Sequence, residues 1–198
     1  MIAVSWALLI LTVSIAVPLV IRPFYYAHID ALHLTDSGFS REEIVEAYDE
    51  MMDFCFFGGE FSTGVMKFSE DGKSHFEDVG RLFRLDFAVM IVSAVIVAVT
   101  WKKQKELRWR MHTCLYWGGM GLLLFFAVIA FIGSFDFSQT FIVFHKIFFP
   151  GKTNWWFDPG RDQIILVLPE IFFRNCAILI VGTLFALCGA AILGDRKK

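Results

Sequence analysis

Residues 135–173 read FDFSQTFIVFHKIFFPGKTNWWFDPGRDQIILVLPEIFF, and the rest of the chain is organised around this stretch. Residues three and four apart are neighbours on a helix, so one face gathers Phe137, Phe141, Phe144, His145, Phe148 and Phe149. A turn rich in Trp, Asp, Pro and Gly follows. An imidazole on a wall of aromatic rings is either a core or interface histidine satisfied by a neighbour, or a functional group.

The composition of the whole chain is that of a membrane protein. Its 198 residues are 57% hydrophobic and include 23 phenylalanines, whereas soluble domains are nearer half apolar. Four apolar runs are long enough to cross a hydrocarbon core of roughly 30 Å as helices. We therefore predict an all-α integral membrane protein with four transmembrane helices and a small extracellular helical cap. The expected spans are residues 1–22, 85–101, 116–133 and 172–193.

The charge of the connecting segments predicts the orientation. The loop at residues 102–115 and the tail at residues 194–198 are basic, so both are expected in the cytoplasm together with both termini. Residues 23–84, an acidic cap loop with amphipathic helices, and residues 134–171 then face outward. The aromatic side chains Tyr25, Tyr26, Trp155 and Trp156 are expected to anchor the membrane interface.

Local patterns predict where helices begin and where they pack. The sequence Ser40-Arg41-Glu42-Glu43 has the capping-box pattern, and an apolar stripe through Ile44, Tyr48, Met51, Met52 and Cys55 follows it. The same pattern at Ser74 predicts a helix that begins there and runs into the second span. Gly118, Gly119 and Gly121 predict close helix contact in the third span.

The histidines His75 and His145 are the candidate catalytic groups. His75 is expected in the first turn of a helix, where the positive end of the helix dipole favours a neutral imidazole, the form that a general base needs. Both residues fall in outward segments, so two imidazoles can converge at the membrane boundary. The alternative is two unrelated interfacial histidines.

Three further polar residues are weaker candidates. Asp158 and Asp162 could orient an imidazole, or could serve only the turn between them. Arg174 lies at the start of the fourth span, where a charge is costly and therefore suggests function. The alternative is that the Arg174 side chain only extends to the lipid headgroups.

Other classes of site have little support. No zinc or nucleophile-elbow motif, phosphate-binding glycine loop or nucleic-acid-binding run is present. We expect no metal and no cofactor. The cysteines read as apolar residues, with a Cys55–Cys176 disulfide as the alternative if both face an oxidising side.

Two short motifs resemble the lipoprotein intramolecular transacylases, integral membrane proteins of Gram-positive bacteria. One comprises the sequences FHKIFF at residues 144–149, WFDP at residues 156–159 and LPEIFF at residues 168–173, together with Asp162. The other is the pattern H-x-x-D-V that begins at His75. The four spans and the outer cap also match. The resemblance implies a bacterial plasma-membrane enzyme that uses two catalytic histidines, His75 and His145.

The resemblance also implies the reaction. Its substrate is a diacylglyceryl-modified lipoprotein, from which the sn-2 acyl chain moves to the α-amino group of the N-terminal cysteine and leaves a lyso-form product. Membrane lipids are expected around the site, and the oligomeric state stays open. The substrate-binding residues assigned on this basis are Phe141, Phe144, Phe148, Trp156, Asp158, Asp162 and Arg174.

Two other functions stay open from the residues alone. One is a non-enzymatic four-span accessory or sensor protein, in which the histidines only fill an interface. The other is a lipid-ester hydrolase, which needs the same base but admits water. A dry aromatic pocket favours transfer because water would otherwise hydrolyse the ester.

Overall fold

The computed structural model describes residues 2–103 and 108–195, with side chains for residues 3–100 and 116–193. The described chain is helical, with α1 (Ile2–Val20), α2 (Arg22–Ala31), α3 (Arg41–Phe57), α4 (Glu70–Lys103), α5 (Arg108–Phe135), α6 (Phe137–Phe148) and α7 (Glu170–Asp195), and with the short 3₁₀ helices η1 (Leu34–Ser37) and η3 (Gln163–Leu166). The predicted all-α class is confirmed. The predicted cytoplasmic loop and tail each include positions outside the described residues, namely 104–107 and 196–198.

The chain divides into two compact units. The first comprises residues 1–20, 85–136 and 176–198, and the second comprises residues 21–84 and 137–175. The long helices α4 and α7 contribute residues to both units. The first unit holds the apolar helices, and the second holds the candidate site.

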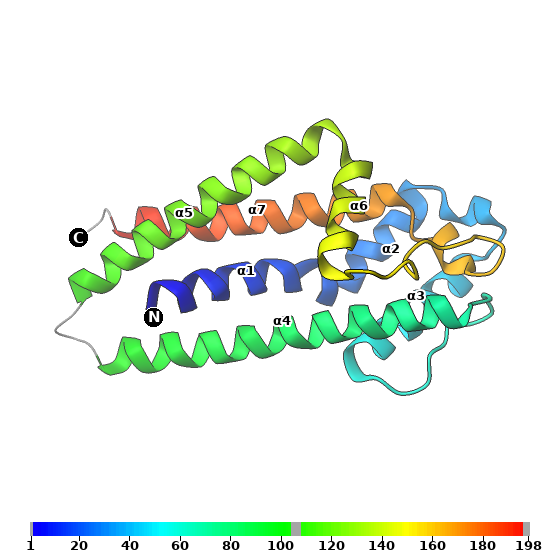
Figure 1. The fold of residues 1–198 in the computed structure, drawn as a ribbon, viewed down its shortest axis with the longest axis horizontal. Coiled ribbons are helices and arrows are strands. Elements are labelled where there is room, and N and C mark those ends of the chain that lie inside the picture. Colours follow the sequence, from blue (N-terminus) through cyan, green and yellow to red (C-terminus); the bar gives the residue numbers. More distant parts are fainter. Residues whose placement is uncertain (1, 104–107, 196–198) are drawn as a thin grey trace. The chain divides into compact units, whose positions relative to one another are not determined.

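The first unit has the character of a membrane bundle (Figure 1). Helices α1, α4, α5 and α7 each contain a stretch long and apolar enough to span a bilayer. The buried cluster is small and centres on Ile10, Leu184 and Cys188. Few other large apolar side chains of these helices are buried and many are exposed, as expected where lipid rather than water surrounds them.

Small residues let the helices of this unit approach closely. The sequence predicts such contact at three glycines, and the structure confirms it at two of them. A Cβ atom on Gly118 would lie 3.5 Å from the carbonyl oxygen of Ala3, and one on Gly119 would lie 3.8 Å from Ile192. The prediction is wrong for Gly121, because a Cβ atom there would meet nothing within 4 Å.

The second unit is held together by an aromatic core. The rings of Tyr25 and Tyr48 stack with their centroids 3.7 Å apart, and Phe172 meets Tyr25 edge-on at 5.2 Å. The buried Tyr25 hydroxyl donates a 2.9 Å hydrogen bond to the carbonyl oxygen of Val167. The expectation that Tyr25 anchors the membrane interface is therefore wrong, because this ring joins α2, α3 and α7 in the core.

Helix α3 follows its sequence signals, whereas α4 does not. Ser40 and Glu43 form the predicted capping box, and the predicted apolar stripe of α3 is buried. Helix α4 begins at Glu70 rather than beside Ser74, one turn earlier than predicted. The Ser69 hydroxyl accepts from the backbone N–H of Gly72 and donates to the carboxylate of Asp162, so a residue distant in sequence supports this start.

Candidate catalytic site

The first half of α4 carries His75 ahead of the apolar part of the helix. Seven of the fifteen residues from Glu70 to Arg84 are Asp, Glu, Lys or Arg, whereas residues 85–101 carry only Asp86. His75 lies in the second turn of α4, so its distance from the helix start weakens the dipole effect expected from the sequence.

The structure brings the two candidate histidines together. The imidazole centroids of His75, from α4, and His145, from α6, lie 5.7 Å apart. Each residue is only 6% exposed. The alternative of two unrelated interfacial histidines is wrong in its geometry, because the two rings share one buried site.

Aromatic rings enclose this histidine pair. Phe149 contacts both imidazoles, with centroid distances of 4.9 Å to His75 and 5.7 Å to His145. Phe157 meets His75 edge-on at 5.5 Å, and Trp155 lies 4.8 Å from His145. Trp155, which the sequence suggested as an interface anchor, is part of this enclosure instead.

The hydrogen bond of His145 defines its tautomer. Its Nδ1 lies 2.8 Å from the carbonyl oxygen of Phe141. A carbonyl can only accept, so Nδ1 carries the proton and Nε2 holds a lone pair. Burial lowers the pKa of His145, more than this hydrogen bond raises it. The imidazole is therefore neutral near pH 7, with Nε2 able to take a proton.

His75 is also neutral, for a different reason. Its pKa is lowered to about 4, mainly by burial and also by the nearby His145, while Asp78 opposes the shift. Its Nδ1 is buried and has no hydrogen-bond partner within the described chain. Neutrality therefore comes from burial, with no need for the first-turn helix effect predicted from the sequence.

An ionic cluster joins the loop after α6 to α4. Asp78 accepts hydrogen bonds from Lys152 and from Arg81, the latter at 2.8 Å. Asn154 points its amide nitrogen toward the same carboxylate, at 3.5 Å. Burial raises the pKa of Asp78, but the hydrogen bond from Lys152 and the other donors lower it overall, so the group is ionised. Sequence reasoning did not find Lys152 or Asn154, because their role depends on a partner more than seventy positions away.

The remaining predicted binding residues fall into two groups. Phe141 contacts His145 at 4.3 Å and Phe144 contacts it at 5.4 Å, so both adjoin the site. The ring of Phe148 lies tilted against that of Phe144, with centroids 4.6 Å apart, and Phe148 is about half exposed. Trp156 is 72% exposed. Their role in substrate binding stays a prediction.

The predicted polar residues lie elsewhere. Asp162 is buried and accepts from the backbone and side chain of Ser69. Asp158 is exposed and accepts a hydrogen bond from the backbone of Gly160 within its own turn. Arg174 is exposed. Among the described residues, none of the three forms a hydrogen bond or ion pair with either imidazole. Asp158 and Asp162 instead form hydrogen bonds that support the loop.

His28, on α2, takes part in two hydrogen bonds. Its Nδ1 donates to the carbonyl oxygen of Phe24 at 2.6 Å, and its Nε2 accepts from Asn175 at 2.9 Å. This pairing satisfies the polar Asn175 at the start of the fourth predicted span. In the described part of the chain, Cys55, Cys176 and Cys188 are free thiols, so the alternative of a Cys55–Cys176 disulfide is wrong.

The helices and the buried histidine pair define a multi-pass membrane protein with a site suited to acid–base chemistry. The family described as the lipoprotein intramolecular transacylase Lit matches residues 1–173. The chain belongs to this family, and is therefore a membrane-integral acyltransferase with a lipoprotein as its partner. Comparison with curated proteins gives no match.

Solved structures agree with this assignment. The membrane-integral lipoprotein intramolecular transacylase Lit from Bacillus cereus is 26% identical, with a TM-score of 0.87 over 98% of this chain and 91% of that one. Two more structures of the B. cereus protein carry one histidine replaced, by arginine or by alanine. Both are 25% identical over 98% of this chain, with TM-scores of 0.82 and 0.83 over 87% and 89% of those chains.

Proposed function

We propose that this chain moves the sn-2 acyl chain of a diacylglyceryl lipoprotein to the α-amino group of its N-terminal cysteine, with His75 and His145 as its catalytic residues. The observation that carries the proposal is the pair of buried, neutral imidazoles 5.7 Å apart inside a ring of aromatic side chains. The family and the B. cereus structures support the acyl transfer, and the geometry supports the assignment of the two residues.

The reaction needs a base for the attacking amine and a proton for the departing oxygen. His145 takes the amine proton at Nε2 as the nitrogen attacks the sn-2 ester carbonyl. The new C–N bond forms, the C–O bond to glycerol breaks, and the proton passes to the glycerol oxygen. An N–H of His75 stabilises the negative charge on oxygen during this exchange. No water is consumed, and both histidines end neutral.

The enclosure favours transfer over hydrolysis. Phe149, Phe157 and Trp155 surround the imidazoles, and this apolar wall limits the water that could compete with the amine. The donor ester and the acceptor amine belong to one substrate molecule, so holding them together supplies much of the rate acceleration. A covalent acyl-enzyme is not required.

Mass spectrometry of lipoprotein N-termini tests this proposal. We expect a diacyl-lipoprotein host that expresses the chain to yield an N-terminal lipopeptide of unchanged mass, with one acyl chain moved from ester to amide. A lipopeptide lighter by one acyl chain would show hydrolysis instead. No change would show that the chain does not perform this transfer. We expect activity to persist in EDTA, and loss of activity that zinc restores would contradict a reaction carried by the histidines alone.

A further inference from the structure

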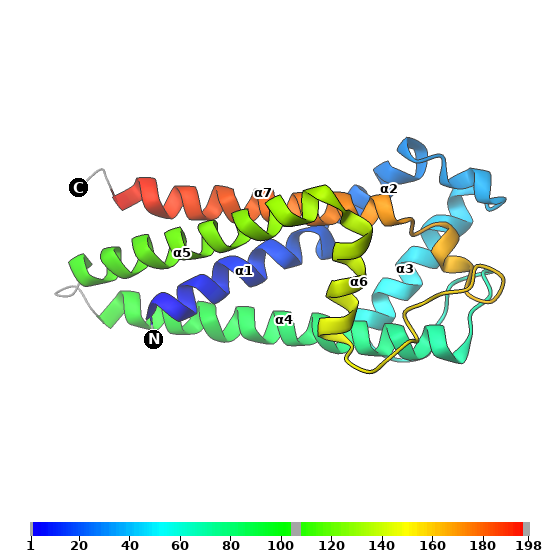
Figure 2. The same ribbon diagram turned by 45° about the horizontal axis from the view of Figure 1, so that its top comes forward.

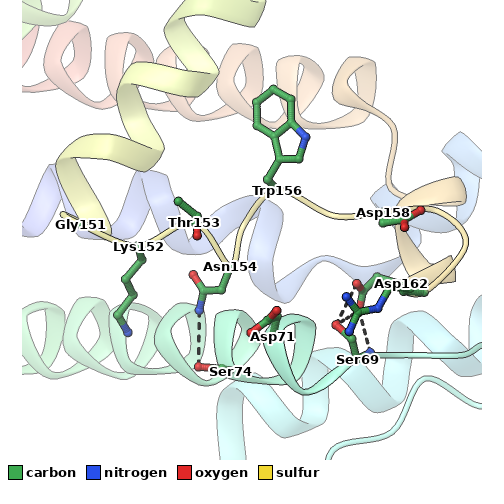
Figure 3. Close-up of a pocket in the computed structure, with 11 residues that line it drawn as sticks. Ser69, Asp71, Ser74, Gly151, Lys152, Thr153, Asn154, Trp156, Asp158 and Asp162 are labelled. Atoms are coloured by element: carbon green, nitrogen blue, oxygen red, sulfur yellow. Dashed lines mark hydrogen bonds between the residues drawn. The ribbon is translucent and has the colours of Figure 1, made fainter.

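A polar pocket of about 390 Å³ lies against the same segment of α4 that carries His75 (Figure 3). Its walls are the first turns of α4, including Asp71 and Ser74, and the loop that follows α6, including Thr153 and Asn154. This volume is in the range of ligand-binding pockets. The proposed chemistry does not use the pocket, because the imidazoles sit among aromatic rings.

Two residues connect this pocket to the histidine pair. Ser74 lines the pocket and directly precedes His75, and Asn154 lines it and directly precedes Trp155, the ring that contacts His145. The amide nitrogen of Asn154 points to the Ser74 hydroxyl at 3.4 Å (Figure 3). The pocket is therefore lined by residues adjacent in the chain to His75 and to the aromatic neighbour of His145.

One residue that lines the pocket, Asn154, carries an acceptor that lacks a donor. The Oδ1 atom of Asn154 is buried and has no hydrogen-bond partner in the part of the chain that the structure describes. A buried polar atom left unpaired is costly, so such an atom beside a pocket indicates a ligand that donates a hydrogen bond. A peptide N–H is a donor of this kind, and each residue of a polypeptide other than proline carries one.

The charges around the pocket do not favour a ligand of one sign. Asp71 and Asp158 face it together with Lys152 and Arg161, and Lys152 is already paired with Asp78. Mixed charge of this kind does not match a phosphate or a polyanion. It suits the main chain of a peptide, whose dipoles carry both partial charges and whose side chains vary.

We propose that this pocket binds the first residues that follow the lipid-modified cysteine, through their main chain, with Asn154 Oδ1 accepting a peptide N–H. This inference rests on the proposed function, because it assigns the peptide part of the same substrate. The pocket thereby orients the cysteine amine toward His145 without reading the sequence of the lipoprotein. Lipoproteins with different residues after the cysteine are then accepted alike.

Two synthetic substrates test the assignment with the purified full-length protein. One is a diacylglyceryl-cysteine N-methylamide, and the other is the same lipid-modified cysteine followed by four residues. We expect the wild-type kcat/KM to be about tenfold higher for the longer substrate, the effect of one or two buried hydrogen bonds. Thr153→Trp, which fills the pocket, should reduce this ratio to near one. Thr35→Trp, at an exposed position on η1, serves as the matched control and should keep the ratio.

Asn154→Leu provides a second variant that retains the side-chain size. We expect it to raise the KM of the longer substrate severalfold and so to lower the ratio. Equal kcat/KM for both substrates in the wild type, or an unchanged ratio in both pocket variants, would overturn the pocket assignment while leaving the transfer reaction in place. Failure of the wild type to convert either substrate would overturn the proposed function, and the pocket assignment with it.

Discussion

His75 and His145 reach the same neutral state through different surroundings. The Nδ1 proton of His145 is fixed by the carbonyl of Phe141 one turn earlier in α6, whereas His75 is neutral because burial disfavours its charged form. An imidazole that is neutral in the folded protein is a proton acceptor at physiological pH. This shared property is what makes the pair suitable for moving a proton from an amine to an alkoxide.

Substitution of either histidine should stop the reaction without unfolding the protein. We expect His75→Gln and His145→Gln to lower the yield of N-acylated, lyso-form lipoprotein by a factor of about 10² to 10⁴, the usual contribution of acid–base catalysis. The measurement is mass spectrometry of the lipopeptide, with membrane insertion checked by fractionation. His33→Asn is the control, because His33 is exposed and adopts a left-handed backbone that Asn tolerates. Normal product from one of the glutamine variants would remove that histidine from the mechanism.

The lowered pKa of His75 predicts a loss of stability in acid. The pKa is about 4 in the folded protein and about 6.5 when exposed, so between these values the unfolded state binds more protons. The stabilisation is therefore complete above pH 6.5 and is lost as the pH falls toward 4. Thermal unfolding in detergent at pH 7.5 and 4.5 should show a smaller drop in Tm for His75→Gln than for the wild type. An identical drop in both proteins would show that His75 is not the group responsible.

At the scale of elements, the start of α4 positions the site. Asp162 holds Ser69 through two hydrogen bonds of 2.8 Å, one from the backbone N–H and one from the hydroxyl. This contact fixes the first turn of the helix that carries His75 to the loop that carries Trp155 and Phe157. Figure 2 shows this loop running from α6 back along the first turns of α4. The aromatic enclosure of the histidines thus depends on a polar contact outside it.

Gly72 is required by this contact. A Cβ atom at this position would clash with the Asp162 carboxylate, which is itself held by Ser69. We expect Gly72→Ala to displace Asp162 and to destabilise the protein by about 1–3 kcal/mol, the cost of leaving buried hydrogen-bonding groups unpaired. Thermal unfolding in detergent measures this change. Gly182→Ala is the matched control, because a Cβ atom there meets nothing within 4 Å.

The double variant Gly72→Ala with Asp162→Ala separates the clash from a general intolerance of alanine. Once the carboxylate is absent, the added methyl group has little to displace, so the two effects should be far from additive. We expect the double variant to be about as stable as Asp162→Ala alone. Fully additive losses would show that Gly72 is required for another reason.

At the scale of the whole molecule, the described chain has four helices able to span a membrane, and this agrees with its family. The orientation remains a prediction from the basic residues of the loop at 102–115 and of the tail. That orientation places the histidine pair at the extracellular face, where the outer leaflet would supply a diacylglyceryl lipoprotein.

A tag at the C-terminus tests this orientation. We expect the tag to resist protease added to intact cells and to be digested once the membrane is opened, because a basic tail is retained on the cytoplasmic side. An added Cys at exposed Thr153, labelled from outside by a membrane-impermeant thiol reagent, gives an independent test of the opposite face. A tag digested on intact cells would reverse the topology and place the site in the cytoplasm.

Much of the architecture could be predicted from local patterns. The four apolar runs, the capping box at Ser40 and the buried stripe of α3 all match the structure, because each depends on residues within a few turns of one another. The beginning of α4 did not follow from such a pattern. Asp162 completes its cap, and a local sequence pattern cannot indicate a partner 93 residues away.

The sequence by itself determined that this protein is a helical membrane protein. Its two short motifs indicated the family and the two candidate histidines. Only the tertiary structure decided that His75 and His145 share one enclosure, that Lys152 and Asn154 join the Asp78 cluster, and that Tyr25 belongs to the core. The physical reason is the separation along the chain over which each effect acts. Hydrophobicity and capping act between neighbours in the chain, whereas burial, pKa and hydrogen-bond partners depend on which distant segments fold against each other.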